Sequence, residues 1–136
     1  MGKRVHVVSK QVEYGNTEAF NWKGEEFKCL LRNCGANACG EDYSDNFDLP
    51  VGDYERSLTI LKRMKENPDL TNDDLADLKV ETEDGQNNFD PDLIDINDIK
   101  ESIKILDYTI EELIEILENF YEERDKDNDW IEFSAW

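Results

Sequence analysis

The apolar residues of this chain change their period along the sequence, and that change restricts the folds open to it. The valines of residues 5–8 are β-branched and show no helical period. Residues 130–136 alternate between apolar and polar side chains, which is typical of a half-buried strand. We therefore predict that residues 4–12 and 129–135 are strands of one small antiparallel sheet that includes both chain termini.

Between these two segments the apolar residues recur every three or four positions, as on one face of a helix. This period predicts helices over residues 22–34, 52–66 and 110–123. Thr109 and Glu112 have the spacing of a capping box at the start of the last helix. The apolar residues that we expect in the core are Phe27, Leu30, Leu31, Leu58, Leu61, Leu113, Ile114, Leu117, Ile131 and Phe133.

The remaining segments carry weaker patterns. We expect short helices over residues 71–78 and 99–106, an acidic loop over 79–97, and short strands around 38–39 and 47–49. The sequence thus predicts an α+β fold in which a small sheet packs against about four to five helices. A chain of 136 residues is the size of one domain, and we treat residues 1–136 as one.

The charge of this domain is unevenly distributed. The formal net charge is −19. Residues 1–68 carry 11 acidic and 10 basic side chains, whereas residues 69–136 carry 23 acidic and 5 basic ones. Nearly all the excess negative charge therefore lies in the second half. Such a field repels nucleic acids and anionic membranes and attracts cations and basic proteins, so we expect no direct nucleic-acid or membrane partner.

Features of the N-terminus and the cysteines bear on where the protein is located. The apolar run that follows Lys3 and Arg4 is too short for a secretory signal, and no apolar segment approaches the roughly 18 residues that span a bilayer. The three cysteines are an odd number, which argues against a framework of disulfides. We expect a cytoplasmic protein.

Residues 125–129, Asp-Lys-Asp-Asn-Asp, resemble the start of an EF-hand calcium loop. Asp125, Asp127 and Asp129 place oxygen atoms at loop positions 1, 3 and 5. The sixth position, which requires glycine, holds Trp130, and the twelfth, which requires a bidentate glutamate, holds Trp136. The resemblance covers five residues. We expect a solvated acidic turn here and keep calcium binding as an alternative.

The cysteines have a C-x4-C-x4-C spacing. Structural zinc sites use pairs of ligands at closer spacing, and His6 is the only histidine that could complete four ligands with Cys29, Cys34 and Cys39. Cys29 and Cys34 fall within the first predicted helix, where small buried hydrophobic side chains are the simpler interpretation. We therefore predict that the cysteines are reduced and metal-free, and that the protein needs no cofactor.

No pattern of catalytic residues is recognisable. His6 lies in a valine-rich segment without a motif around it, and the serines have no nucleophile-elbow context. A glycine-rich phosphate loop is absent from the sequence. We predict that the protein is not an enzyme.

The last predicted helix is rich in glutamate. Glu111, Glu115, Glu118 and Glu122 are spaced by 4, 3 and 4 residues and therefore share one face. A helix that is merely solvated would normally mix charges of both signs, because like charges at this spacing repel. We expect this face to bind a basic partner. The complete set of predicted contact residues is Asp73, Asp74, Asp77, Glu111, Glu115, Glu118 and Glu122.

These observations favour a small acidic protein-binding module of the inhibitor, immunity-protein or DNA-mimic kind, which docks on a basic protein. The comparison with such proteins is one of charge and size and does not rest on a sequence match. Two alternatives stay open: a divalent-cation module at residues 125–129, and an accessory protein whose charge only maintains solubility.

Overall fold

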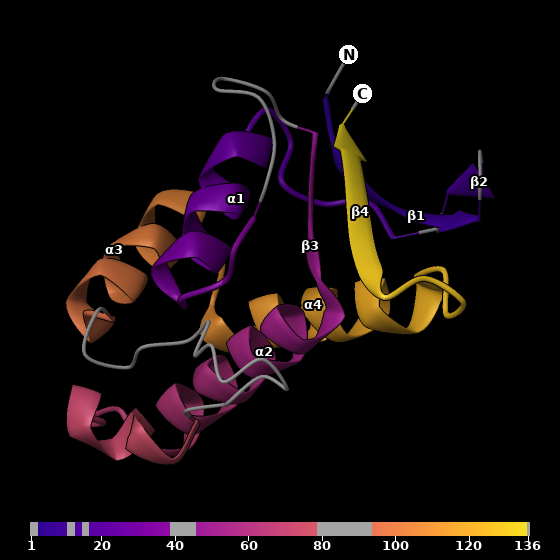
Figure 1. Ribbon diagram of the computed structural model, residues 1–136. Coiled ribbons are helices and arrows are strands. Elements are labelled where there is room, and N and C mark those ends of the chain that lie inside the picture. The colour runs from indigo at the N-terminus through magenta and orange to yellow at the C-terminus, as the bar shows by residue number, and fades with distance from the viewer. Residues whose placement is uncertain (1–2, 11–12, 15–16, 39–45, 79–93, 136) are drawn as a thin grey trace.

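The computed structural model of the protein describes residues 3–10, 13–14, 17–38, 46–78 and 94–135, and it shows an α+β fold (Figure 1). In chain order the elements are β1 (Val5–Lys10), β2 (Glu13–Tyr14), α1 (Gly24–Asn33), β3 (Phe47–Pro50), α2 (Val51–Glu66), the 3₁₀ helix η1 (Asn72–Leu78), α3 (Ile96–Leu106), α4 (Ile110–Glu123) and β4 (Trp130–Ala135).

The first and last strands are neighbours in one sheet, as the apolar pattern predicts. Strand β1 pairs antiparallel with β4, and β4 pairs antiparallel with β3. The two-residue strand β2 extends the sheet beyond β1, which gives the order β2-β1-β4-β3. Strand β3 coincides with the predicted strand around 47–49. Of the strand predicted around 38–39, Ala38 is not in a strand, and Cys39 lies outside the described residues.

The sheet has one apolar and one polar face, because successive side chains of a strand point to opposite sides. Phe133 lies in register with both Val7 and Phe47, and all three are buried. On the other face, Asp48 lies opposite Glu132, which is exposed. Phe133 contacts Phe27 of α1 and Phe120 of α4, so these helices cover the face of the sheet that carries Phe133.

The helices pack as two pairs, α1 with α3 and α2 with α4. Helix α1 is followed by its C-cap residue Cys34 and then by Gly35, whose φ of 88° is in the left-handed region that favours glycine. The amide of Gly35 donates to Arg32 O and that of Ala36 donates to Leu31 O, which is a Schellman motif. This motif ends the first helix at Asn33, within one residue of the end predicted by the helical period over residues 22–34.

The predicted helices at 22–34, 52–66 and 110–123 correspond to α1, α2 and α4, with ends that differ by no more than two residues. The predicted segment 71–78 is a 3₁₀ helix, and the helix predicted around 99–106 begins earlier, at Ile96. Residues 94 and 95 precede that helix. The rest of the predicted 79–97 loop, up to residue 93, lies outside the described residues.

All ten predicted core residues are buried. A chain of aromatic contacts lies at the centre of this core, where Phe27 stacks on Phe20 with ring centroids 4.3 Å apart and contacts Phe133 edge-on at 5.2 Å. Phe120 of α4 joins both Phe27 and Phe133. These contacts hold α4 against the sheet and thereby determine which of its faces is exposed.

Candidate functional site

Helix α4 presents the acidic face that the sequence predicts. Its start is secured by the capping box, in which Thr109 Oγ1 accepts from the Glu112 amide at 3.1 Å and Glu112 Oε1 accepts from the Thr109 amide at 3.1 Å. The side of the helix that faces the core is formed by Leu113, Ile114, Leu117 and Phe120, which are buried. On the opposite side four carboxylates are exposed, and we call them the α4 acidic face: Glu111, Glu115, Glu118 and Glu122.

A groove of about 460 Å³ lies between α4 and α2, beside the α4 acidic face. Its wall on α2 includes Glu55, Leu58 and Lys62. Its wall on α4 includes Glu118, Tyr121 and Glu122. Three of these six side chains are acidic and one is basic, so the groove is a negatively charged hollow with an apolar and aromatic component.

Tyr121 connects the two walls of the groove. Its hydroxyl donates to Glu55 Oε2 at 2.6 Å, and this hydrogen bond to a carboxylate raises the pKa of the tyrosine. The guanidinium of Arg124 lies over its ring, 3.7 Å from the centroid. Its ring is also parallel to that of Tyr54, with the centroids 6.2 Å apart. Contacts on several sides therefore fix the position of the Tyr121 ring in the groove.

Two members of the α4 acidic face have cationic partners. Lys62 Nζ lies 2.9 Å from Glu118 Oε1 across the groove, and Lys126 Nζ lies 3.6 Å from Glu122 Oε2 along the chain. Glu111 and Glu115 form no ion pair with any residue that the structure describes. Two of the four carboxylates of the α4 acidic face are thus already neutralised by a neighbouring lysine. The other two are available to attract a cation.

The predicted contacts Asp73, Asp74 and Asp77 lie on η1, beyond the C-terminal end of α2, and none of them lines the groove. Asp77 forms a two-pronged ion pair with Arg63, with N–O distances of 2.7 and 2.8 Å. The hydrogen bonds from Arg63 lower the pKa of Asp77. These contacts attach η1 to α2.

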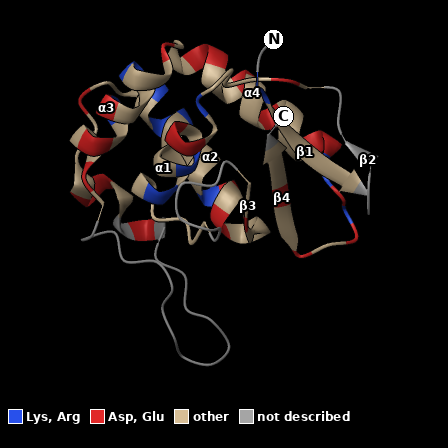
Figure 2. Cartoon of the chain, turned by 90° about the horizontal axis from the view of Figure 1, so that it is seen from above, with Lys and Arg blue, Asp and Glu red and all other residues tan. Residues whose placement is uncertain are grey.

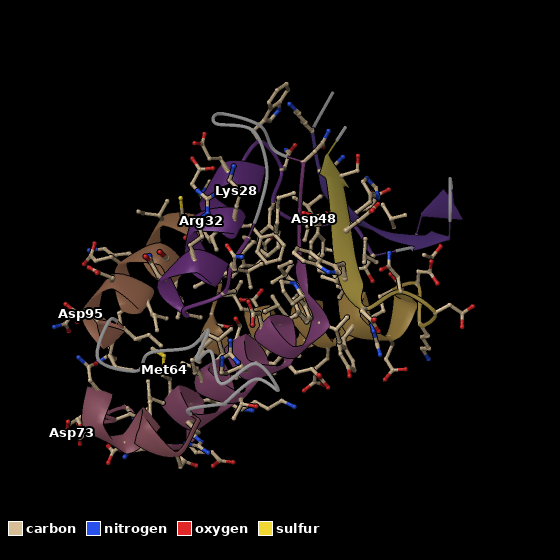
Figure 3. All side chains as sticks on the ribbon, in the orientation of Figure 1. Lys28, Arg32, Asp48, Met64, Asp73 and Asp95 are labelled. Carbon is tan, nitrogen blue, oxygen red and sulfur yellow. The ribbon has the colours of Figure 1, made fainter. Side chains whose placement is uncertain are left out.

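The other two η1 carboxylates differ in what they do. Asp74 Oδ2 accepts from the amide and the hydroxyl of Thr71, which stabilises the start of the 3₁₀ helix. Asp73 is exposed at the edge of the molecule (Figure 3). The structure therefore brings together the four glutamates of α4 but leaves the three aspartates of η1 as a separate group.

The acidic turn at residues 125–129 is organised by its own side chains. Asp125 Oδ1 accepts from the Asp127 amide at 3.1 Å, and Asn128 Oδ1 accepts from the Trp130 amide at 3.0 Å. Both are hydrogen bonds from the backbone to an Asx side chain two residues earlier, as in turns. Among the described residues, which include Asp125, Asp127 and Asp129, no three acidic, histidine or cysteine side chains are grouped so as to hold a metal ion.

Cys29, Cys34 and His6 are not among the residues that line the groove. Cys34 is buried, and burial raises the pKa of its thiol to about 12. His6 is also buried, and desolvation lowers its pKa. Cys29 is exposed, which corrects our prediction that it is buried. It lies two positions after Phe27, about 200° around the helix and therefore on the side away from the core. Cys39 lies outside the described residues.

The α2 wall of the groove is what sequence reasoning missed. Glu55 and Lys62 are seven residues apart and share one face of α2, but this spacing does not reveal which helix they face. By its spacing from Leu113 and Leu117, Tyr121 belongs to the apolar stripe of the last helix. Its polar end could be anticipated from the general need of a tyrosine hydroxyl for a partner, but Glu55 could not be identified as that partner.

The fold and the groove define an acidic α+β protein, and comparison with known proteins adds nothing to this description. No family model, no curated protein and no solved structure matches the chain. In the part of the chain that the structure describes, no helix has the length and apolar character needed to cross a membrane. The geometry and charge of the surface are therefore the features from which a function can be inferred.

Proposed function

We propose that this protein is a small acidic binding module that docks on a basic partner protein through the α4 acidic face and the adjoining groove. One observation carries the proposal: four exposed glutamates share one face of α4, and two of them, Glu118 and Glu122, line a hollow of about 460 Å³ with an aromatic side chain in its wall. A groove of this kind can accept cationic side chains and bury their apolar stems against Leu58 and Tyr121.

The charge distribution supports a basic partner. Helix α4 contains six glutamates and no basic residue, whereas α1, α2 and α3 all carry basic side chains (Figure 2). Like charges at a spacing of three or four residues destabilise a helix by a few tenths of a kcal/mol per pair. A binding role accounts for this cost, because a patch of one sign steers an oppositely charged partner and accelerates its association.

The finer proposal is an inhibitor of the immunity-protein or DNA-mimic kind, which would act in the cytoplasm. The negative surface of α4 is complementary in charge to the basic cleft of a protein that binds nucleic acid, and it would occupy that cleft in place of the nucleic acid. This role requires neither a catalytic residue nor a cofactor. It predicts no direct contact of this chain with nucleic acid or with membranes.

The calcium alternative rests on the spacing of Asp125, Asp127 and Asp129 alone, and among the described residues no group of side chains is arranged to hold a metal ion. A calcium loop needs its carboxylates to converge on one point. Asp125 and Asn128 instead accept hydrogen bonds from the backbone of the turn. Under the solubility alternative the net negative charge is also needed, but its position is not. Solubility would then be the same whichever exposed glutamates are neutralised.

A comparison of two neutralised variants tests the proposal. The α4 variant carries Glu111→Gln, Glu115→Gln, Glu118→Gln and Glu122→Gln. A control variant with the same change in net charge carries Glu18→Gln, Glu66→Gln, Glu101→Gln and Glu132→Gln, all exposed and all outside α4 and η1. Each protein is immobilised and exposed to a lysate of its own source cells at low and high salt.

The wild type and the control variant should retain the same basic proteins at low salt and release them at high salt, whereas the α4 variant should retain none of them. Equal capture by all three proteins would show that the α4 acidic face is not the binding site. Capture that falls equally in both variants would show that only the net charge matters.

A further inference from the structure

Lys62 extends from α2 across the groove to Glu118 on α4. Its Nζ atom is 2.9 Å from Glu118 Oε1, and the two side chains are about half exposed, at 52% and 49%. Among the described residues that line the groove, Lys62 is the one basic side chain. The free protein therefore holds an ammonium group of its own inside a negatively charged hollow.

The other two carboxylates of the groove are differently occupied. Glu55 accepts the hydrogen bond from Tyr121, and Glu122 lies 3.6 Å from Lys126, which belongs to the turn that follows α4. Glu118 is thus the carboxylate that receives a cation from within the groove. The position of the Lys62 ammonium group shows where a cationic group fits between the two helices.

The contact between Lys62 and Glu118 is suited to exchange. An ion pair between half-exposed side chains contributes little to stability, because water screens both charges and the long side chains lose conformational freedom. The Lys62 side chain is already partly buried in the groove. An incoming lysine or arginine would likewise bury its apolar stem if it contacts Tyr121 or Leu58. Replacing one cation by another leaves the charge of the groove unchanged and avoids isolating Glu118.

We propose that Glu118 is the cation subsite for a lysine or arginine side chain of the basic partner, and that Lys62 occupies this subsite in the free protein and leaves it on binding. This inference rests on the proposed function and adds to it a defined contact and an internal competitor. Because Lys62 competes for Glu118, it weakens the binding of any other cation at this subsite. A partner must therefore make further contacts along the α4 acidic face.

Lys65 provides a matched control. It lies one turn further along α2, is exposed, and forms no ion pair with any described residue. Lys62→Gln and Lys65→Gln change the net charge equally and remove side chains of the same length. Any difference between them reports the position of the charge and not its amount.

The probe is a fluorescein-labelled hexa-arginine peptide, whose dissociation constant is measured by fluorescence anisotropy with the full chain. We expect Lys62→Gln to bind the peptide about two- to fivefold more tightly than Lys65→Gln, which is the range expected for removal of a surface ion pair. In a Glu118→Gln background this advantage should disappear, because the carboxylate for which Lys62 and the peptide compete is no longer present.

Nuclear magnetic resonance provides a second readout on the wild type. Asn119 lines the groove, and its side-chain amide resonance should shift on addition of the peptide. Equal affinities of the two lysine variants, or an advantage of Lys62→Gln that persists without Glu118, would overturn the inference.

The outcomes separate this inference from the proposed function. If the α4 variant loses the peptide but the two lysine variants bind it equally, the docking surface stands and the role of Lys62 is wrong. If the α4 variant binds the peptide as tightly as the control variant does, the docking surface itself is wrong.

Discussion

At the scale of single residues, Leu117 determines which face of α4 is exposed. It is fully buried, and its carbonyl oxygen accepts a hydrogen bond from the buried Tyr54 hydroxyl at 2.6 Å. The side chain and the backbone of this residue thus both attach α4 to its neighbours. The glutamates on the opposite side are exposed as a consequence.

Replacing Leu117 by alanine should lower the free energy of unfolding by about 2–5 kcal/mol, because it leaves a cavity in a packed core. Ile105→Ala is the control, since Ile105 is 55% exposed, and it should change stability by no more than about 0.5 kcal/mol. Urea denaturation followed by circular dichroism measures both. A loss below about 1 kcal/mol for Leu117→Ala would mean that the buried face of α4 is wrongly assigned.

The two described cysteines should differ in reactivity. Cys34 is buried with a pKa of about 12, so it has almost no thiolate at pH 8, whereas Cys29 is exposed. In a Cys39→Ser variant, an aromatic disulfide reagent should label Cys29 at once and Cys34 only in denaturant. Labelling of both thiols at the same rate in the native protein would contradict the burial of Cys34.

Some residue-scale features are beyond sequence reasoning. Phe20 and Trp22 have φ angles of 59° and 60°, in the left-handed region that aromatic residues rarely adopt. Tertiary contacts hold them there: Phe20 stacks on Phe27, and the Trp22 amide donates to Lys3 O at 2.7 Å. No local pattern predicts such a conformation, because it is imposed by tertiary packing and by a hydrogen bond to the segment that precedes β1.

At the scale of elements, the helices with strong local signals could be located most closely from the sequence. The capping box begins α4 at the predicted residue, and α1 ends at Asn33, within one residue of the predicted end. The segment 71–78 was predicted only as a helix, and it forms a 3₁₀ helix. Asp74 accepts a hydrogen bond from the Thr71 amide at the start of this helix, and Asp77 binds Arg63. The spacing of apolar residues in the segment predicts neither contact.

The capping box of α4 can be tested directly. Thr109→Ala should destabilise the protein by about 0.5–2 kcal/mol, because the Glu112 amide loses its side-chain acceptor. Thr109→Ser keeps the hydroxyl and should retain most of the stability. Thermal unfolding followed by circular dichroism compares the two. Equal stability of the alanine and serine variants would show that the cap makes no net contribution.

At the scale of the whole molecule, the net charge of −19 opposes compaction. Salt should therefore raise the melting temperature by a few degrees as the Debye length falls from about 30 Å at 0.01 M to about 8 Å at 0.15 M. The α4 variant should show a smaller rise, since it carries fewer negative charges. A melting temperature that falls with added salt would indicate that ion pairs outweigh repulsion.

The candidate site could be predicted only in part, because it depends on how two helices pack in the whole molecule. The acidic face of α4 follows from its spacing alone, but the groove exists because α2 packs beside α4. The pairing of Lys62 with Glu118 and of Glu55 with Tyr121 joins residues more than fifty positions apart. The separation of the η1 aspartates from this groove likewise depends on how the chain turns after α2.

The central claim is that the α4 acidic face binds a basic protein, and the association rate of a captured partner tests it most directly. The rate constant is measured by stopped-flow fluorescence across a range of salt concentrations for the wild type, the α4 variant and the control variant. For the wild type and the control variant, it should be high at low salt and fall steeply as salt rises, because exposed charges steer the encounter. For the α4 variant it should be lower and nearly independent of salt. The same rate constant and the same salt dependence in all three proteins would contradict the claim.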